Sequence, residues 1–336
     1  MMIVIEYSKV PLAFSVNPNF KSPTKNKNLN MKRLSIVIFS LLWVFSAYGQ
    51  QEPLYTQYMN NHYLINPAVA GSTENHEIRF HHRFQWFNLP GAPRTFSVTY
   101  QGGYENSGFG LKLYSDITGP TQRIGAEGGY AYHLPLTDDI KLGMGLSLKY
   151  LQYTLDLQNI TFVDPSDEIL FSNTNNINVL DASAGLYLYG DNFSAGLSAP
   201  NIIQAPLDYG IDDISRSVEG RLKRHFFVTA GYFLAGPNVS YEASILLRKV
   251  EAAPLQGDLN IRVFFLDEVV FVGASYRQDF ANLTDGSDVL AWLVGVNMER
   301  FHLAYTYDFR LGGTYQSTYG SAHEVTMGID LGPVKR

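Results

Sequence analysis

The feature that most constrains this chain is an alternation of apolar and polar residues with a period of two. Between Glu77 and Trp86 the even positions are apolar apart from His82, whereas every odd position is polar or charged. A β-strand places two such sets on opposite faces. Comparable alternation recurs at 121–133, 139–150, 178–189, 255–265, 301–309 and 323–331.

About fourteen such segments, each of roughly ten residues, follow one another, and a tilted strand needs about that length to cross a bilayer. Short turn-like breaks such as 135–138 and 190–192 alternate with longer connections such as 151–177 and 199–222, as in outer-membrane proteins. Aromatic residues gather toward the strand ends, as they do at membrane interfaces. The strands of a soluble β-sandwich would also alternate between apolar and polar residues, so the alternation alone does not decide between the two folds. Together these features favour an all-β fold over residues 76–336, a transmembrane antiparallel β-barrel of about 14 strands of the outer-membrane type.

Residues 31–49 have the three parts of an export signal. Met31-Lys32-Arg33 is basic, residues 34–45 are apolar, and Ala47-Tyr48-Gly49 offers small residues for cleavage before Gln50. The apolar run is too short for a membrane anchor, which needs ~20 residues. Residues 1–30 hold four lysines and no apolar periodicity. We therefore expect translation to start at Met31, residues 1–30 to be a mis-assigned extension, and the mature protein to reach the cell outer membrane.

Composition and motifs argue against an enzyme. The absence of cysteine excludes disulfides, thiolate metal sites and thiol nucleophiles. A net charge of −6 disfavours nucleic-acid binding. His81 and His82 point to opposite faces of a strand and cannot readily share a metal ion, and no Gly-x-Ser-x-Gly turn occurs. We expect no catalytic residue, no cofactor, no metal ion, no nucleic acid and no small-molecule substrate.

Four glycines lie inside strand segments, as the pairs Gly108/Gly110 and Gly143/Gly145. They open no helix, so they do not form a phosphate-binding loop. We expect them to mark bends or bulges.

The first mature segment, residues 50–75, lacks the alternation. Its core, EPLYTQYMNNHYLINPAVAGS, is rich in Tyr and Asn and too apolar to remain free in water. It is either a turn or strand leading into the barrel, or a segment packed in the lumen or against the periplasmic rim. The width of a barrel of about 14 strands favours the second interpretation, because side chains alone do not easily fill it.

Candidate lumen, rim or partner-contact residues follow from these patterns. Arg79 and Arg83 must face the lumen, because an Arg at the bilayer midplane costs ~2–4 kcal/mol. Pro93 fixes its own φ and biases the residue before it toward extended geometry. Arg94 is expected to pair with an acidic lumenal group such as Glu77. The full set of candidates is Gln57, Tyr58, Asn66, Pro67, Arg79, Arg83, Gln85, Trp86, Pro93 and Arg94.

A series of motifs resembles the PorP/SprF family of the type IX secretion system of Bacteroidota. Each motif is weak alone, but together they span about half of the mature chain in the order of the family. They are QYMNNHYLINPAVAGS (57–72), HRFQW (82–86), GAPRTF (91–96), DITGP (116–120), YAYHL (130–134) and GLYLYGDNFSAGLSAPNIIQ (185–204).

The resemblance implies an outer-membrane barrel without catalytic activity. It implies a role in secreting or surface-anchoring a large cargo protein with a C-terminal sorting domain, often a gliding adhesin. It also implies contact with periplasmic components of the type IX machinery. A passive outer-membrane porin shares the barrel and remains the alternative; a soluble adhesive β-sandwich is a third.

Overall fold

The computed structural model describes residues 52–87, 89–156, 176–207, 220–251, 253–280, 288–311 and 321–334. The expected extension at 1–30 and export signal at 31–49 lie outside this described part.

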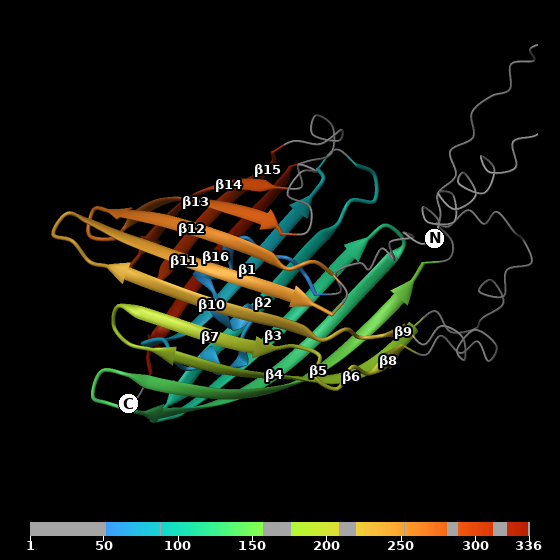
Figure 1. Cartoon of the computed structure of the whole chain (residues 1–336), viewed down its shortest axis with the longest axis horizontal. Helices are drawn as coiled ribbons and strands as arrows, with labels where there is room; N and C mark the ends of the chain where they lie inside the picture. Colours follow the sequence, from blue (N-terminus) through green and yellow to red (C-terminus); the bar gives the residue numbers. More distant parts are fainter. Residues whose placement is uncertain are drawn as a thin grey trace, which may run out of the picture. The chain divides into compact units, whose positions relative to one another are not determined.

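The chain forms a closed, fourteen-strand antiparallel barrel, as the alternation predicts (Figure 1). Its strands are β1 (Asn75–Gln85), β2 (Arg94–Tyr104), β3 (Ser107–Thr118), β4 (Thr121–Pro135), β5 (Lys141–Leu155), β6 (Asn176–Tyr189), β7 (Phe193–Ala199), β10 (His225–Leu234), β11 (Val239–Val250), β12 (Gln256–Phe265), β13 (Val270–Asp279), β14 (Val289–Met298), β15 (Phe301–Arg310) and β16 (Ala322–Pro333).

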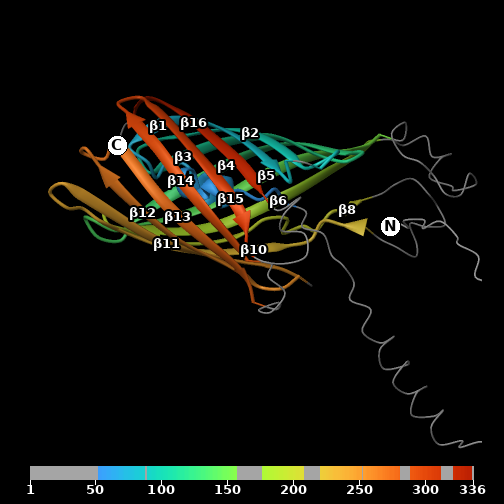
Figure 2. The same ribbon diagram turned by 90° about the horizontal axis from the view of Figure 1, so that it is seen from above.

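Each strand pairs with its sequence neighbours in the barrel, and β1 closes the ring against β16. Figure 2 shows β1, β16 and β15 side by side along this closure. A small separate sheet of β8 (Pro206–Leu207) and β9 (Gly220–Arg221) lies in the connection from β7 to β10. Every barrel strand has a paired strand on both sides, although β7 pairs with β6 only from Ala184 to Tyr189. Closure of this kind is what allows a sheet to sit in hydrocarbon.

The two ends of the barrel differ. One end carries the connections from β2 to β3, β4 to β5, β6 to β7, β10 to β11, β12 to β13 and β14 to β15, each of at most five residues between strands; we call it the short-turn mouth. The opposite end, the long-connection mouth, carries most of the longer links, including those that follow β5 and β7. In outer-membrane barrels the short turns face the periplasm and the long loops face outward.

The alternation separates an apolar outside from a polar inside. In β5, Leu146 and Leu148 are 64% and 75% exposed, whereas Ser147 and Lys149, which alternate with them, are 3% and 1% exposed. The same contrast holds in β1, where Arg79 and Arg83 are buried in the lumen. An outward leucine meets lipid, while an inward lysine keeps its charge among polar partners. None of the described helical turns has the length and apolar character of a membrane-spanning helix.

Candidate functional site

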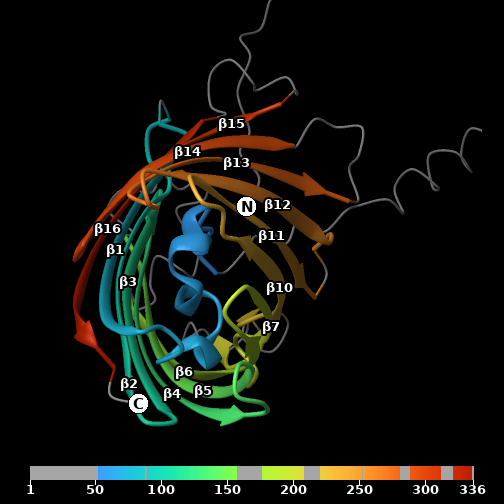
Figure 3. The same cartoon turned by 90° about the vertical axis from the view of Figure 1, so that its left-hand side faces the viewer.

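The lumen contains the segment that precedes β1. We call residues 52–74 the lumen segment. It folds into three short 3-10 turns, η1 (Gln57–Asn60), η2 (His62–Leu64) and η3 (Pro67–Val69). Figure 3 shows these turns inside the ring of strands. The segment starts near the long-connection mouth, descends through the lumen, and enters β1 at the short-turn mouth.

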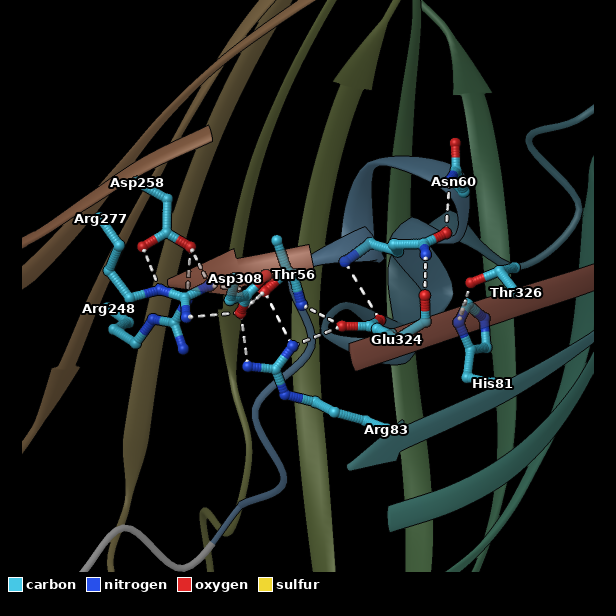
Figure 4. A network of polar contacts seen from close by, with 11 residues as sticks. Thr56, Asn60, His81, Arg83, Arg248, Asp258, Arg277, Asp308, Glu324 and Thr326 are labelled. Carbon is cyan, nitrogen blue, oxygen red and sulfur yellow. Dashed lines mark hydrogen bonds and ion pairs between the residues drawn. The ribbon is translucent and has the colours of Figure 1, made fainter. Parts of the chain in front are cut away.

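Its upper end is held by a cluster of charges that we call the mouth network: Thr56, Arg83, Arg248, Asp258, Arg277, Asp308 and Glu324 (Figure 4). The six charged members come from six strands, β1, β11, β12, β13, β15 and β16, and lie near their ends at the long-connection mouth. Three guanidinium groups face three carboxylates, so the cluster is neutral in sum. All seven side chains are buried.

Arg83 connects the barrel wall to the lumen segment. Its guanidinium donates to Asp308 Oδ2 at 2.6 Å and to Glu324 Oε2 at 2.8 Å. The same group donates to Thr56 Oγ1 at 3.0 Å, and Thr56 Oγ1 donates to Asp308 Oδ2 at 2.7 Å. A buried charge is tolerated when it is paired and hydrogen-bonded in this way.

Glu324 binds the backbone of the lumen segment directly. Its two carboxylate oxygens accept from the amides of Thr56 and Gln57 at 2.8 and 3.1 Å. The Gln57 side-chain amide donates in turn to the Glu324 carbonyl at 2.9 Å. One carboxylate of β16 thereby fixes the entry to η1.

Glu52 forms a second contact near the same mouth. Lys149 Nζ lies 2.5 Å from Glu52 Oε1, and Asn201 Nδ2 donates to the same oxygen at 3.0 Å. Burial alone would raise the pKa of the Glu52 carboxyl, but the ammonium groups of Lys149 and Lys112 hold that pKa below its ordinary value. Glu52 therefore stays ionised and bound to the wall.

The middle of the segment is fixed by single hydrogen bonds to inward side chains. Asn260 of β12 donates to the Tyr58 hydroxyl at 2.5 Å, and Arg262 of β12 donates to Asn60 Oδ1 at 2.5 Å. Asn61 Nδ2 donates to Thr99 Oγ1 at 2.7 Å. These contacts satisfy polar groups that would otherwise be buried without partners.

The lower end of the segment is held by close backbone approach. We call Gly108, Gly143, Gly145 and Gly185 the glycine cradle. A Cβ atom at Gly108 would lie 1.7 Å from the Ala70 carbonyl oxygen, and one at Gly145 would lie 2.4 Å from the Ala68 nitrogen. Any other residue at these positions would displace η3 from the wall.

The expectation of bulges at Gly108, Gly110, Gly143 and Gly145 was wrong. β3 and β5 keep an unbroken register through all four glycines. Among the described strands, the register shifts once, between His76 and Glu77. The glycines instead admit another part of the chain, which is the second common reason for glycine inside a strand.

The candidate residues fall in three places. Gln57, Tyr58, Asn66 and Pro67 are buried in the lumen segment, where Asn66 Nδ2 donates to the Leu186 carbonyl at 2.9 Å. Arg79 and Arg83 face the lumen. The remaining candidates, Gln85, Trp86, Pro93 and Arg94, lie at the long-connection mouth around the link from β1 to β2.

The expected pairing of Arg94 with Glu77 was wrong. Arg94 lies opposite Phe84 in the register of β1 and β2, and its guanidinium carbon sits 5.5 Å from the centre of the Phe84 ring on the outer face. Glu77 lies at the other end of β1 and pairs with Arg79 at 3.3 Å. Strand β1 also ends at Gln85, and Trp86 adopts a left-handed conformation with a φ of 52°.

The key lumen partners missing from the candidates are Thr56, Asp308 and Glu324. A signal for the last two was present in the sequence, because each occupies an inward position of an alternating strand. An ionised side chain on the inward face needs a partner, so these two positions predict contact with an inward cation, although not with which one. Among the described residues no three His, Asp or Glu side chains gather as a metal-ligand set.

The fold and the occupied lumen define a membrane-spanning β-barrel whose lumen holds the segment that precedes its first strand. The sequence matches the family described as type IX secretion system membrane protein PorP/SprF over residues 47–329. The chain belongs to this family.

The chain is also similar to solved structures at low sequence identity. Omp33 of Acinetobacter baumannii is 10% identical, with a TM-score of 0.43, and the match covers 77% of this chain and 98% of that one. The P. putida toluene transporter TodX is 9% identical, with a TM-score of 0.46 and coverage of 81% and 94%. A search of curated proteins found no match.

Proposed function

We propose that this protein is a closed outer-membrane component of the type IX secretion system that supports secretion or surface anchoring of a partner cargo protein. The cargo would carry a C-terminal sorting domain, as a gliding adhesin does. The observation that carries the proposal is the filled lumen: the barrel's own segment occupies the space through which a solute would pass. A barrel closed in this way is suited to presenting a surface rather than to conduction.

The long-connection mouth offers the surface for such a partner. Trp86, Phe87 and Leu89 lie on the link from β1 to β2 and are all exposed. Phe87 packs edge-on against His323 at 5.3 Å between ring centres, so the link is tied to the neighbouring end of β16. Exposed aromatic side chains held on a fixed frame are frequent anchors of protein interfaces.

The mouth network supports this surface from below. It joins six strand ends to the lumen segment through charge-assisted hydrogen bonds. A partner that pulls on the loops would act on a frame whose strands are cross-linked across the lumen. In this proposal the lumen segment is a structural brace, and periplasmic components of the machinery contact the opposite mouth.

The porin alternative needs an open path. The buried mouth network and the glycine cradle argue against one in this conformation. A porin would give steady ion conductance and would leave the set of surface proteins unchanged when its gene is removed.

The test is deletion of the gene, followed by mass spectrometry of cell-surface and culture-medium proteins. We expect one large protein with a C-terminal sorting domain to vanish from the surface or to leak into the medium. Complementation with Phe87→Ala should restore cargo display only in part, whereas Phe109→Ala, an exposed aromatic near the short-turn mouth, should restore it fully. An unchanged surface set with reduced uptake of small solutes would support the porin alternative instead.

A further inference from the structure

A pocket opens at the short-turn mouth beside the lumen segment. It has a volume of about 230 Å³ and lies between η1 and η2 on one side and β6, β7, β10 and β11 on the other. We call it the rim pocket. The lumen segment does not fill this part of the mouth, so the pocket is a recess that ends against the segment.

Aromatic rings form much of its wall. Tyr187 and Tyr189 of β6 stack at 5.3 Å between ring centres, and the His62 ring lies 6.3 Å from that of Tyr187. Tyr189 is held in place by its hydrogen bond to His133 Nδ1 at 3.1 Å. Rings fixed in this way present faces and edges without further ordering cost, which favours binding.

The charged residues that line the pocket are acidic. Asp191 and Glu242 line it, and among the residues that the structure describes no lysine or arginine does. Glu242 Oε2 already accepts from Arg262 at 2.6 Å, whereas Asp191 is exposed on the turn between β6 and β7. Burial lowers the pKa of His62, so its ring adds no positive charge to the wall at neutral pH. Carboxylates beside aromatic rings complement an ammonium or guanidinium group.

We propose that the rim pocket is a docking site for a lysine- or arginine-bearing peptide segment of a periplasmic partner. The acidic lining and the fixed aromatic walls of the pocket favour a basic side chain. The pocket lies at the short-turn mouth, which faces the periplasm in outer-membrane barrels, so we expect the partner to be periplasmic. The identity of that partner as a component of the secretion machinery rests on the proposed function. The preference of the pocket for a basic side chain rests only on the residues that line it.

The test uses the purified full-length barrel in detergent and three labelled pentapeptides, Gly-Lys-Phe-Lys-Gly, Gly-Ser-Phe-Ser-Gly and Gly-Glu-Phe-Glu-Gly, with binding followed by fluorescence anisotropy. We expect the lysine peptide to bind and the other two to bind far more weakly. Asp191→Asn should weaken the lysine peptide by about fivefold, the size expected for one exposed charge contact. Asp138→Asn, which removes an exposed carboxylate from another turn of the same mouth, should change nothing.

A second variant tests the same pocket without altering Asp191, so that the conclusion does not depend on one carboxylate alone. Ser72→Arg places a cation in the lining and should weaken the lysine peptide more than Asp191→Asn does. Equal binding of the three peptides, or equal effects of Asp191→Asn and Asp138→Asn, would overturn the proposal. So would binding of an N-acetylglucosamine trisaccharide without binding of the lysine peptide, because the pocket would then be a glycan site. Surface proteomics of the deletion strain tests the proposed function separately, so either can fail alone.

Discussion

The two ends of the lumen segment are held by opposite means. At the long-connection mouth, Thr56 and Gln57 are bound by ionised side chains that cross the lumen from several strands. At the short-turn mouth, Ala68 and Ala70 lie directly against the backbone of the glycine cradle, and one side chain adds to this contact, because His133 Nε2 lies 2.7 Å from the Ala70 carbonyl oxygen. The first attachment depends on charge and geometry, the second mainly on shape. An attachment by charge can be broken by neutralising one group, whereas an attachment by shape is lost when a methyl group is added.

The largest expected effect comes from breaking the mouth network. Arg83→Met leaves Glu324 and Asp308 buried without their closest cation, and removing one member of a buried ion pair costs about 3–5 kcal/mol. We expect the free energy of unfolding to fall by that amount, measured by urea titration in lipid vesicles. The upper part of the lumen segment should become sensitive to protease.

Arg94→Met is the matched control. It makes the same substitution at a guanidinium on the outer face, over the Phe84 ring. Its effect on stability should be under about 1 kcal/mol, as for an exposed cation–π contact. Equal effects of the two variants would contradict the role of the network.

A smaller effect is expected at the glycine cradle. Gly108→Val places atoms on the Ala70 carbonyl, and inserting extra methyl groups into a packed site costs about 1–3 kcal/mol. Here the lower part of the segment, near Ala70, should become sensitive to protease while the upper part stays protected. Gly128→Val is the control, because a Cβ at Gly128 meets no atom within 4 Å. If the two valines behaved alike, close approach would not be what holds η3.

The smallest effect is expected at the start of η3. Asn66 Oδ1 accepts from the Ala68 amide at 3.0 Å, as a helix N-cap does. Asn66→Ala should lower the free energy of unfolding by about 1 kcal/mol. Asn66→Ser keeps an accepting oxygen for the cap, introduces no charge and loses the donor to Leu186, so an intermediate loss is expected. Full loss with Asn66→Ser would show that the bond to the wall, rather than the cap, is the important one.

The wall could be predicted from sequence because strand alternation is local. The inward positions of Arg79 and Arg83 followed from the cost of a charge in lipid. Their partners could not be assigned in the same way. Arg83 meets Asp308 and Glu324 across 225 and 241 residues, a pairing that exists only once β1 closes against β16.

The Arg94 error has the same origin. Whether a residue faces the lumen depends on the register of its strand against the previous strand. The alternation does not determine the length of the link between β1 and β2, so the sequence did not predict the register of β2. Arg94 turned out to lie opposite outward Phe84, while Thr95 lies opposite inward Arg83. The glycine cradle was visible as glycine inside strands, but the sequence did not reveal what approaches it.

The most direct test of the closed barrel is single-channel recording in planar bilayers. The intact protein, with the lumen segment in place, should show no steady conductance. A variant lacking residues 52–64 keeps η3 on its cradle but removes the part that the mouth network binds, and it should conduct in stable steps. Steady conductance of the intact protein, equal to that of the shortened variant, would contradict the account.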